Sequence, residues 1–330
     1  MPPKISVLMS CYNGSRWLRE AIDSVLSQTF VDFELILVDD GSTDETWKII
    51  QSYRDRDNRI VAISKKNTGV ADSLNVGISQ ARGAWVARLD QDDICEPTRL
   101  EEQFSFVCAH PAVILLGAGF YEIDEYGRDL MKHRCPSGHS QLLRRLERMQ
   151  SFFPHSSAFY RVDEVRKAGG YNPRLPLAED WRLWPDLALR GEIACLPRCL
   201  VRIRKHSGQV SRESRRQLRD GMAATVCYFL RKAGCQDPSV DASADEWIIF
   251  LNWVDDRIRE SGYYDRRIAW GNARDSFFAR GSWPVRILRF AISLMWSGHA
   301  VALVCEKVIG TSLPMRISRE WVSANRRSVR

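Results

Sequence analysis

The chain has 330 residues, of which 45% are hydrophobic and 27% are charged. This balance is that of a globular protein, and it excludes a disordered chain, a collagen and a multi-spanning membrane protein. The formal net charge is +7, but residues 286–330 carry eight basic and two acidic side chains. The excess therefore belongs to a basic C-terminal tail, and no nucleic-acid groove is expected in the rest of the chain.

The first 90 residues alternate predicted strands with predicted helices. Apolar runs at 5–10, 34–38, 60–63 and 84–89 predict strands, and the segments between them carry apolar residues at helical spacing. Such alternation predicts parallel βαβ units. The strands are continuously apolar because helices cover both faces of a parallel sheet.

The rest of the chain is predicted to change character near residue 211. Residues 113–206 mix short strands with a helix near 178–190, and the pattern beyond 211 is helical. We therefore predict an α/β domain at 1–211, with a mostly parallel, Rossmann-like sheet flanked by helices. A helical region with the basic tail is predicted at 212–330.

Residues 290–305 form an uncharged run within this tail. Its 16 residues are fewer than the about 20 that span a bilayer, and Ser297, Gly298 and His299 interrupt it. We favour a buried helix. A helix lying on an acidic membrane surface and a true span stay open as alternatives.

The nine cysteines include no CxxC pair, and no histidine cluster completes a zinc site around Cys195 and Cys199. We interpret them as reduced, small apolar residues. The amino terminus lacks the pattern of a signal peptide and leads directly into a predicted strand. We expect a cytoplasmic protein, with peripheral contact to the inner face of the cytoplasmic membrane as an open addition.

Polar and acidic residues follow three of the predicted strands: CYNG at 11–14, DDGS at 39–42 and DQDD at 90–93. In open parallel sheets, ligands bind at the carboxyl ends of the strands. Asp90 and Asp92 would repel each other unless a cation lies between them. Carboxylate oxygens suit Mg²⁺ or Mn²⁺, which bridge to substrate phosphates. A capped turn is the structural alternative, but two acidic strand ends together favour a metal–diphosphate site.

Other phosphate-binding signatures are absent from the sequence. There is no GxxxxGK[ST] loop, and Gly117-Ala118-Gly119 lacks the third glycine of a dinucleotide fingerprint. A P-loop NTPase and a nicotinamide dehydrogenase are therefore disfavoured.

The chain resembles family 2 glycosyltransferases, which have the GT-A fold. The motifs that carry the resemblance are ISVLMSCYNGSRWLREAIDSVLSQTFVDFELILVDDGSTD, NTGVADSLNVGISQARGAWVARLDQDDICEPTRL, AGGYNPRLPLAEDWRLW and HSGQVS. They stand in the family's order over residues 4–211, and the C-terminal 120 residues carry no usable resemblance. One departure is Cys11, which replaces the usual small or proline residue and fits sterically.

The resemblance implies a role for most of the polar residues. Asp92 and His206 would hold Mg²⁺ or Mn²⁺, and Asp180 of the Glu179-Asp180 pair would be the catalytic base. Trp181 and His155 would face the acceptor. The nucleotide sugar would be bound by Cys11, Tyr12, Asn13, Asp39, Asp40, Asn67, Gly69, Arg82, Asp90 and Gln91.

The implied function is inverting transfer of a sugar from a nucleoside-diphosphate sugar, with a UDP-sugar favoured. The acceptor would be a hydroxyl of a glycan or lipid-linked saccharide in bacterial surface polysaccharide biosynthesis. A metal neutralises the leaving diphosphate, and a carboxylate takes the proton of the attacking hydroxyl. In-line displacement separates the two groups, and the sequence positions of Asp92 and Asp180 fit this.

Three other functions stay open: a nucleotidyltransferase, a sugar-nucleotide-binding scaffold and a membrane-associated structural partner. The first would show a glycine-rich basic loop after the first strand, which CYNG does not resemble. Single residues also have structural interpretations. The Glu179-Asp180 pair fits a helix N-terminus, Trp181 fits a core position, His206 fits a surface position and His155 fits a loop.

Overall fold

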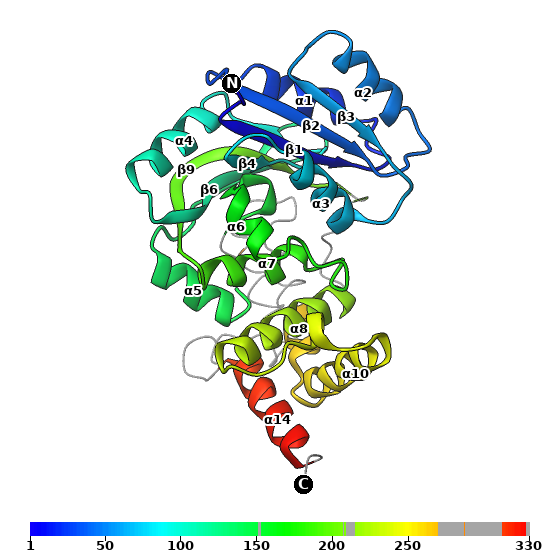
Figure 1. The fold of residues 1–330 in the computed structure, drawn as a ribbon, viewed down its shortest axis with the longest axis vertical. Helices are drawn as coiled ribbons and strands as arrows, with labels where there is room; N and C mark the ends of the chain where they lie inside the picture. The colour runs from blue at the N-terminus through cyan, green and yellow to red at the C-terminus, as the bar shows by residue number, and fades with distance from the viewer. Residues whose placement is uncertain (151–152, 207, 209–214, 270–286, 288–311, 328–330) are drawn as a thin grey trace. The chain divides into compact units, whose positions relative to one another are not determined.

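The computed structural model describes residues 1–150, 153–206, 208, 215–269, 287 and 312–327. The chain divides into two compact units, one of residues 1–146 and 150–209 and the other of residues 147–149 and 210–330. The first unit contains the sheet, and the described part of the second is helical (Figure 1). The uncharged run at 290–305 lies outside the described residues.

The sheet has nine strands, with β3-β2-β1-β4-β8-β6-β9-β5 as the order of eight and with β7 paired to β6. The bounds are β1 Ile5–Cys11, β2 Phe33–Asp39, β3 Ile60–Ser64, β4 Trp85–Arg88, β5 Ile94–Cys95, β6 Val113–Ile123, β7 Asp129–His133, β8 Phe159–Arg161 and β9 Glu192–Arg204. Strands β1 to β4 are parallel, as predicted. Strand β8 is antiparallel to both β4 and β6, and β6 is parallel to β9. Strands β6 and β9 therefore run in the direction of β1.

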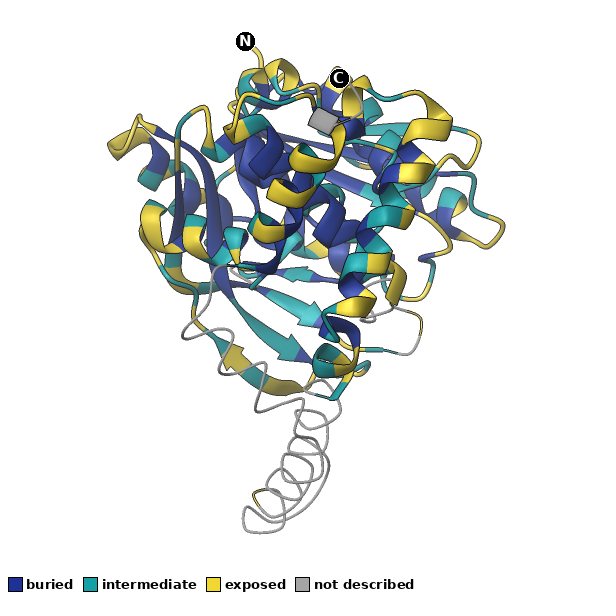
Figure 2. Ribbon diagram, turned by 90° about the horizontal axis from the view of Figure 1, so that it is seen from below, coloured by how far each residue is buried: buried dark blue, intermediate teal, exposed yellow. Residues whose placement is uncertain are grey.

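Helices cover both faces of the sheet. The bounds are α1 Leu18–Leu26, α2 Thr46–Arg54, α3 Val70–Gln80, α4 Arg99–Ala109, α5 His139–Glu147, the 3₁₀ turn η1 His155–Ser157, α6 Val162–Lys167 and α7 Glu179–Ala188. Side chains of α1, α2 and α4 share one core with Val7 and Met9 of β1. Side chains of α3, α6 and α7 share the other core with Leu8. Successive residues of β1 thus serve opposite faces. Strands β1 and β2 are almost wholly buried, whereas β7 is mostly exposed, and Figure 2 shows buried, intermediate and exposed strands.

Strand direction gathers the loops that carry the predicted site. Because β1 to β4 and β9 point the same way, the loops that follow them leave one edge of the sheet. Strand β8 runs in the opposite direction, so η1, which precedes it, lies at that same edge. Segments 11–14, 39–46, 65–69, 90–93, 155–157 and 204–206 are therefore neighbours.

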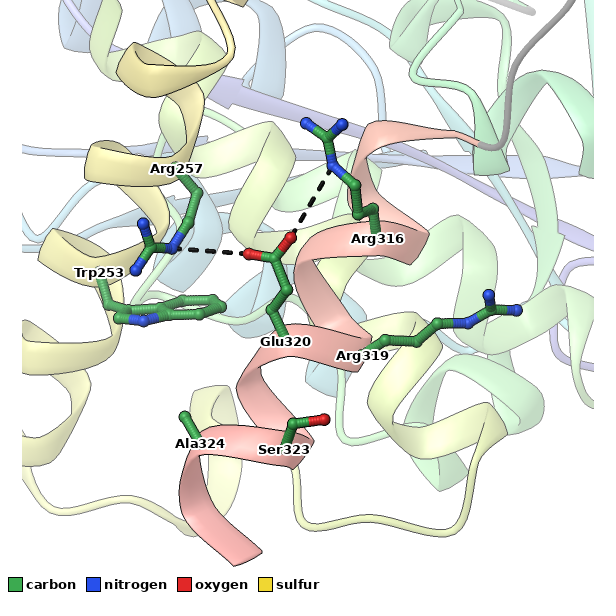
Figure 3. Close-up of a pocket in the computed structure, with 7 residues that line it drawn as sticks. All are labelled: Trp253, Arg257, Arg316, Arg319, Glu320, Ser323 and Ala324. Atoms are coloured by element: carbon green, nitrogen blue, oxygen red, sulfur yellow. Dashed lines mark ion pairs between the residues drawn. The ribbon is translucent and has the colours of Figure 1, made fainter. Parts of the chain in front are cut away.

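The second unit contains α8 Arg215–Lys232, α9 Pro238–Asp241, α10 Ala244–Glu260 and α14 Leu313–Arg327. Helix α8 is buried from Asp220 to Leu230. A surface pocket of about 450 Å³ opens between α10 and α14 (Figure 3). Within it Glu320 forms ion pairs with Arg257 at 3.6 Å and Arg316 at 3.9 Å, and none of the predicted site residues lines it. Among the described helices, none has the length and apolarity needed to cross a membrane.

Candidate functional site

The loop after β1 interlocks with the loop after β2. The Asn13 N–H donates to Ser42 Oγ at 3.0 Å, and the Thr43 N–H donates back to Asn13 Oδ1 at 2.8 Å. Asn13 has φ 47°, a left-handed conformation that asparagine tolerates. The next residue, Gly14, donates its N–H to Thr46 Oγ1 at 2.8 Å. The two strand ends predicted to face the nucleotide are therefore joined.

Gln91 joins the same β1 loop to the acidic loop after β4. Its Oε1 accepts the Tyr12 N–H at 2.9 Å, and its Nε2 donates to the Tyr12 carbonyl at 2.9 Å. A Cβ on Gly14 would lie only 2.0 Å from Gln91 Oε1, so this contact needs a glycine. The Tyr12 side chain itself is exposed.

Asp39 and Asp40, at the carboxyl end of β2, are both buried. Asp40 accepts the N–H groups of Thr68 at 3.0 Å and Gly69 at 2.9 Å, and it pairs with Lys65. Gly69, at φ 99°, adopts a conformation that favours glycine. Asp40 thereby fixes the loop that carries Asn67 and Gly69. Asp39 accepts the Ser64 hydroxyl at 3.3 Å.

Three carboxylates cluster after β4: ligand oxygens of Asp90, Asp92 and Asp93 all lie within 4.8 Å of one another. Burial, together with the neighbouring carboxylates, raises the pKa of Asp92 and raises that of Asp93 well above its usual range. Burial acts on Asp90 too, but the Arg88 guanidinium outweighs it and lowers the pKa of Asp90. A divalent cation relieves this crowding of acids, so the donor set fits one.

Asp92 and His206 are the predicted metal ligands that the structure brings together. His206 Nε2 lies 2.8 Å from Asp92 Oδ2, and the Gly208 N–H donates to His206 Nδ1 at 3.2 Å. Asp93 is already engaged, because it accepts the Arg204 N–H at 2.9 Å and bonds Ser156 Oγ. Asp92 and His206 are therefore better placed than Asp93 to hold an ion.

Glu179 and Asp180, the pair predicted to contain the catalytic base, lie in the first turn of α7. Asp180 Oδ1 accepts the Trp181 N–H at 2.8 Å. Burial and the adjacent Asp180 raise the pKa of Glu179 to about 8. Burial raises the pKa of Asp180 to about 6, while its bond to the Trp181 N–H acts in the opposite direction. At neutral pH, Asp180 is therefore the more ionised acid and the better proton acceptor.

His155 lies beside this pair, and most of its side chain is buried. Its Nε2 is 2.8 Å from the Tyr171 hydroxyl, its Nδ1 is 3.7 Å from Glu179 Oε1, and its ring packs edge-on to buried Trp184. Burial lowers the pKa of His155 well below its usual range. That His155 faces the acceptor stays a prediction, and the structure places this residue next to Glu179. Trp181 is half-buried and packs against the core.

Arg82 does not join the other predicted residues. It bonds Glu34 through its N–H at 2.8 Å and its Nε at 2.7 Å. Glu34 is the second residue of β2, so Arg82 lies at the amino ends of the strands. The expected contact of Arg82 with the nucleotide phosphates is corrected, because this edge is opposite to the acids.

Several residues that hold the site together were not predicted. Arg204, with a buried side chain, donates from Nε to the Asp92 carbonyl at 2.9 Å. Trp17 packs on His206 with ring centroids 4.2 Å apart. Arg88 pairs with Asp90 and donates to Ser156 Oγ at 3.0 Å. An available signal for Arg88 was a lone charge in the apolar run WVARL, two residues before Asp90.

The acidic cluster at one edge of the sheet fits a cation, and the carboxyls of Glu179 and Asp180 lie near it. Comparison with known proteins identifies the class of enzyme. Residues 6–168 match the model of glycosyl transferase family 2. The chain is 34% identical over 211 residues to the amylovoran biosynthesis glycosyltransferase AmsE of Erwinia amylovora, across 63% of this chain and 78% of that protein. It is 32% identical over 213 residues to an uncharacterized glycosyltransferase of Haemophilus influenzae, across 63% and 79%. The chain belongs to glycosyltransferase family 2 and is a glycosyltransferase.

Solved structures support the GT-A fold. TarS 1–349 of S. aureus in complex with UDP-GlcNAc matches with a TM-score of 0.58 at 18% identity, over 97% of this chain and 92% of that one. The mannosyltransferase PcManGT of Pyrobaculum calidifontis in complex with GDP-Man and Mn²⁺ matches with a TM-score of 0.53 at 15% identity, over 97% and 86%. The predicted fold is confirmed.

Proposed function

We propose that this glycosyltransferase moves a sugar from a nucleoside-diphosphate sugar, with UDP as the favoured nucleotide, to a hydroxyl of a glycan or lipid-linked saccharide, with inversion. The observation that carries the proposal is the convergence of Asp90, Asp92 and Asp180 at one edge of the sheet. The name of AmsE concerns amylovoran biosynthesis, and the TarS structure contains UDP-GlcNAc. The first name supports a role in bacterial surface polysaccharide biosynthesis and the TarS complex supports a UDP-sugar, whereas the PcManGT complex contains GDP-Man.

On the donor side, the exposed Tyr12 ring and the Asn67 loop border the nucleotide, and Asp90 binds the donor ribose or sugar. Asp92 and His206 hold Mg²⁺ or Mn²⁺, which supplies neutralisation of the leaving diphosphate. Asp39 and Asp40 support these loops from buried positions. Binding of the diphosphate is thus assigned to the ion and the β4 loop.

On the acceptor side, Asp180 takes the proton from the acceptor hydroxyl while that oxygen attacks the anomeric carbon. A pKa of about 6 keeps Asp180 mostly ionised at neutral pH, whereas Glu179, at about 8, is mostly protonated. A single displacement, with one carboxylate as base and none as nucleophile, inverts the anomeric centre. Trp181, at the same turn, is our proposed contact with the acceptor sugar.

We further propose that the basic tail contacts anionic lipid at the inner face of the cytoplasmic membrane. Arg316 and Arg319 of α14 are exposed, while Ile317 between them is buried. Positive side chains on an outer helix face are attracted to acidic headgroups. This contact would bring the enzyme close to a lipid-linked acceptor.

The experiment that tests the function is a panel of UDP-, GDP- and dTDP-sugars with Mn²⁺, in which the released nucleotide is measured with and without EDTA. Release of nucleoside diphosphate that stops with EDTA is the expected result. A parallel reaction with a nucleoside triphosphate and a sugar 1-phosphate tests the rival function, because pyrophosphate release there, without nucleoside diphosphate release from the sugar nucleotides, would indicate a nucleotidyltransferase. Binding of the sugar nucleotide without any turnover, with or without candidate glycan acceptors, would indicate a scaffold.

A further inference from the structure

Arg88 is a buried cation directly beneath the acidic edge. It is the last residue of β4 and is 3% exposed. Its guanidinium pairs with Asp90 and donates to Ser156 Oγ at 3.0 Å, while Ser156 Oγ donates to Asp90 Oδ2 at 2.7 Å. Arginine is almost never fully buried unless it is paired. Arg88, Asp90 and Ser156 therefore contact one another, and Ser156 Oγ also bonds Asp93.

The turn η1 extends this set toward the base. Ser156 points to Asp90, while its neighbour His155 lies 3.7 Å from the Glu179 carboxyl. One short turn thus touches an acid of the donor side and an acid of the acceptor side. Within the described residues, the buried Nε of Arg88 has no hydrogen-bond partner, so Asp90 and Ser156 do not use all of its donors.

The charge of Arg88 reaches both sides of the site. It lowers the pKa of Asp90, and it opposes the rise that burial causes in the pKa of Glu179 and Asp180. Among the described residues, the groups that act on the pair include its own carboxyls, Asp90 and the Trp181 N–H, and His155 and Tyr171 lie beside Glu179. Arg88 is therefore the cation that offsets these acids.

We propose that Arg88 is a positioning residue for both halves of the reaction: it holds Asp90 for the donor sugar and, with the η1 turn, sets the charge and placement of the Glu179-Asp180 pair. This inference rests on the proposed function, because it takes Asp90 as a donor ligand and Asp180 as the base. It adds that one buried guanidinium serves the two sides together.

The test compares Arg88→Met, Arg88→Lys and Ser156→Ala with the control Arg59→Met. Arg59 is likewise paired with a carboxylate, that of Asp57, but it is half-buried and stands before β3 at the opposite edge of the sheet. Two quantities are measured: affinity for the UDP-sugar with Mn²⁺ by calorimetry, and the acid limb of the pH profile of kcat. Thermal unfolding of each variant establishes that it is folded.

Arg88→Met should weaken donor affinity on the order of 10–100-fold. It should also move the acid limb upward by roughly half a pH unit or more, because a cation that favoured ionised Asp180 is lost. Arg88→Lys should return the acid limb of the kcat profile to its wild-type pH, because the positive charge is kept. It should not restore the affinity for the UDP-sugar, since an ammonium lacks the planar fork of a guanidinium. Arg59→Met should match the wild type in both.

Turnover by the wild type, together with an unchanged affinity and acid limb in Arg88→Met, would overturn the positioning role while leaving the proposed function intact. A wild type that turns over no sugar nucleotide would instead overturn the function itself. If Arg88→Met does not fold, Ser156→Ala decides. A loss of donor affinity with an unmoved acid limb supports the role of Arg88 and Ser156 on Asp90, and unchanged affinity refutes it.

Discussion

His206 Nε2 lies 2.8 Å from Asp92 Oδ2, although 114 residues separate them in the chain. The contact arises because β4 and β9 end at the same edge of the sheet, so the loops that follow them meet. Trp17 packs on the His206 ring, and Arg204 holds the Asp92 carbonyl. The pair is thus supported from both sides before any ion binds.

Substitution of Asp92 should remove metal-dependent turnover. In Asp92→Ala the carboxylate of the cluster that contacts His206 is lost, and metal affinity should fall at least about tenfold. Mn²⁺ titration by calorimetry, together with nucleoside diphosphate release, measures both effects. Asp163→Ala, which removes an exposed acid of α6, is the control. Normal Mn²⁺ affinity in Asp92→Ala would contradict the assignment.

Asp180→Asn should abolish sugar transfer and leave donor binding nearly intact, because only the proton acceptor is lost. In the wild type, kcat should fall as the pH drops through about 6, where Asp180 becomes protonated. Steady-state kinetics from pH 5 to 8 and UDP-sugar calorimetry provide the measurements. A collapse of donor affinity in Asp180→Asn would show that this residue is structural.

Glu179→Gln should stabilise the fold at alkaline pH. The folded-state pKa of Glu179 is raised to about 8, so its favourable contribution is complete at low pH and is lost as the pH rises through about 8. The neutral amide avoids this loss, by an amount on the order of 2–4 kcal/mol. Denaturant unfolding at pH 4 and pH 9 should show a gain only at pH 9. An equal gain at both values would mean that burial of the charge is not the cause.

Gly14→Ala should weaken donor binding, because a methyl group there would meet the Gln91 amide and break its two bonds to Tyr12. Gly138→Ala is the matched control, since a Cβ at that position meets no atom within 4 Å. UDP-sugar affinity should fall about tenfold in the first variant and stay unchanged in the second. Equal UDP-sugar affinities in Gly14→Ala and Gly138→Ala would show that the contact between Gln91 and Tyr12 does not contribute to nucleotide binding.

Paired substitution of Arg316 and Arg319 by glutamine should reduce binding to vesicles that contain anionic lipid. Each lost arginine is expected to cost about 1 kcal/mol, and added salt should weaken wild-type binding in the same way. Co-sedimentation measures the bound fraction, with Arg54→Gln as the control for an exposed arginine outside the tail. Unchanged, salt-insensitive binding would exclude this helix as the contact.

The meeting of the polar loops at one edge of the sheet could be predicted from the sequence, because these loops follow directly after the strands. Each acidic or glycine-containing turn follows an apolar run, and parallel topology then places these turns together. The direction of the strands also accounts for Arg82. This residue precedes the strand that ends at the acids, so it belongs to the opposite edge. The prediction placed Arg82 by its position in the family motif and did not take the direction of the strand into account.

His155 and Arg88 required the structure. The position of His155 depends on the antiparallel direction of β8, which three residues do not reveal in a sequence. The role of Arg88 depends on a buried partner two residues along the chain and on Ser156, 68 residues away. Long-range pairing of this kind leaves no periodic pattern, although a single charge in a buried strand is a warning that a partner exists.

Two hydrogen bonds between the Gln91 side chain and the Tyr12 backbone join the loop after β1 to the loop after β4, so that the two loops should move together. A nucleobase that displaces Tyr12 would also displace Gln91 and its neighbour Asp92. A cation that binds Asp92 would in turn displace Tyr12 through the Gln91 side-chain amide. Nucleotide and cation should then bind synergistically, and thermodynamic reciprocity requires each to tighten the other by an equal factor.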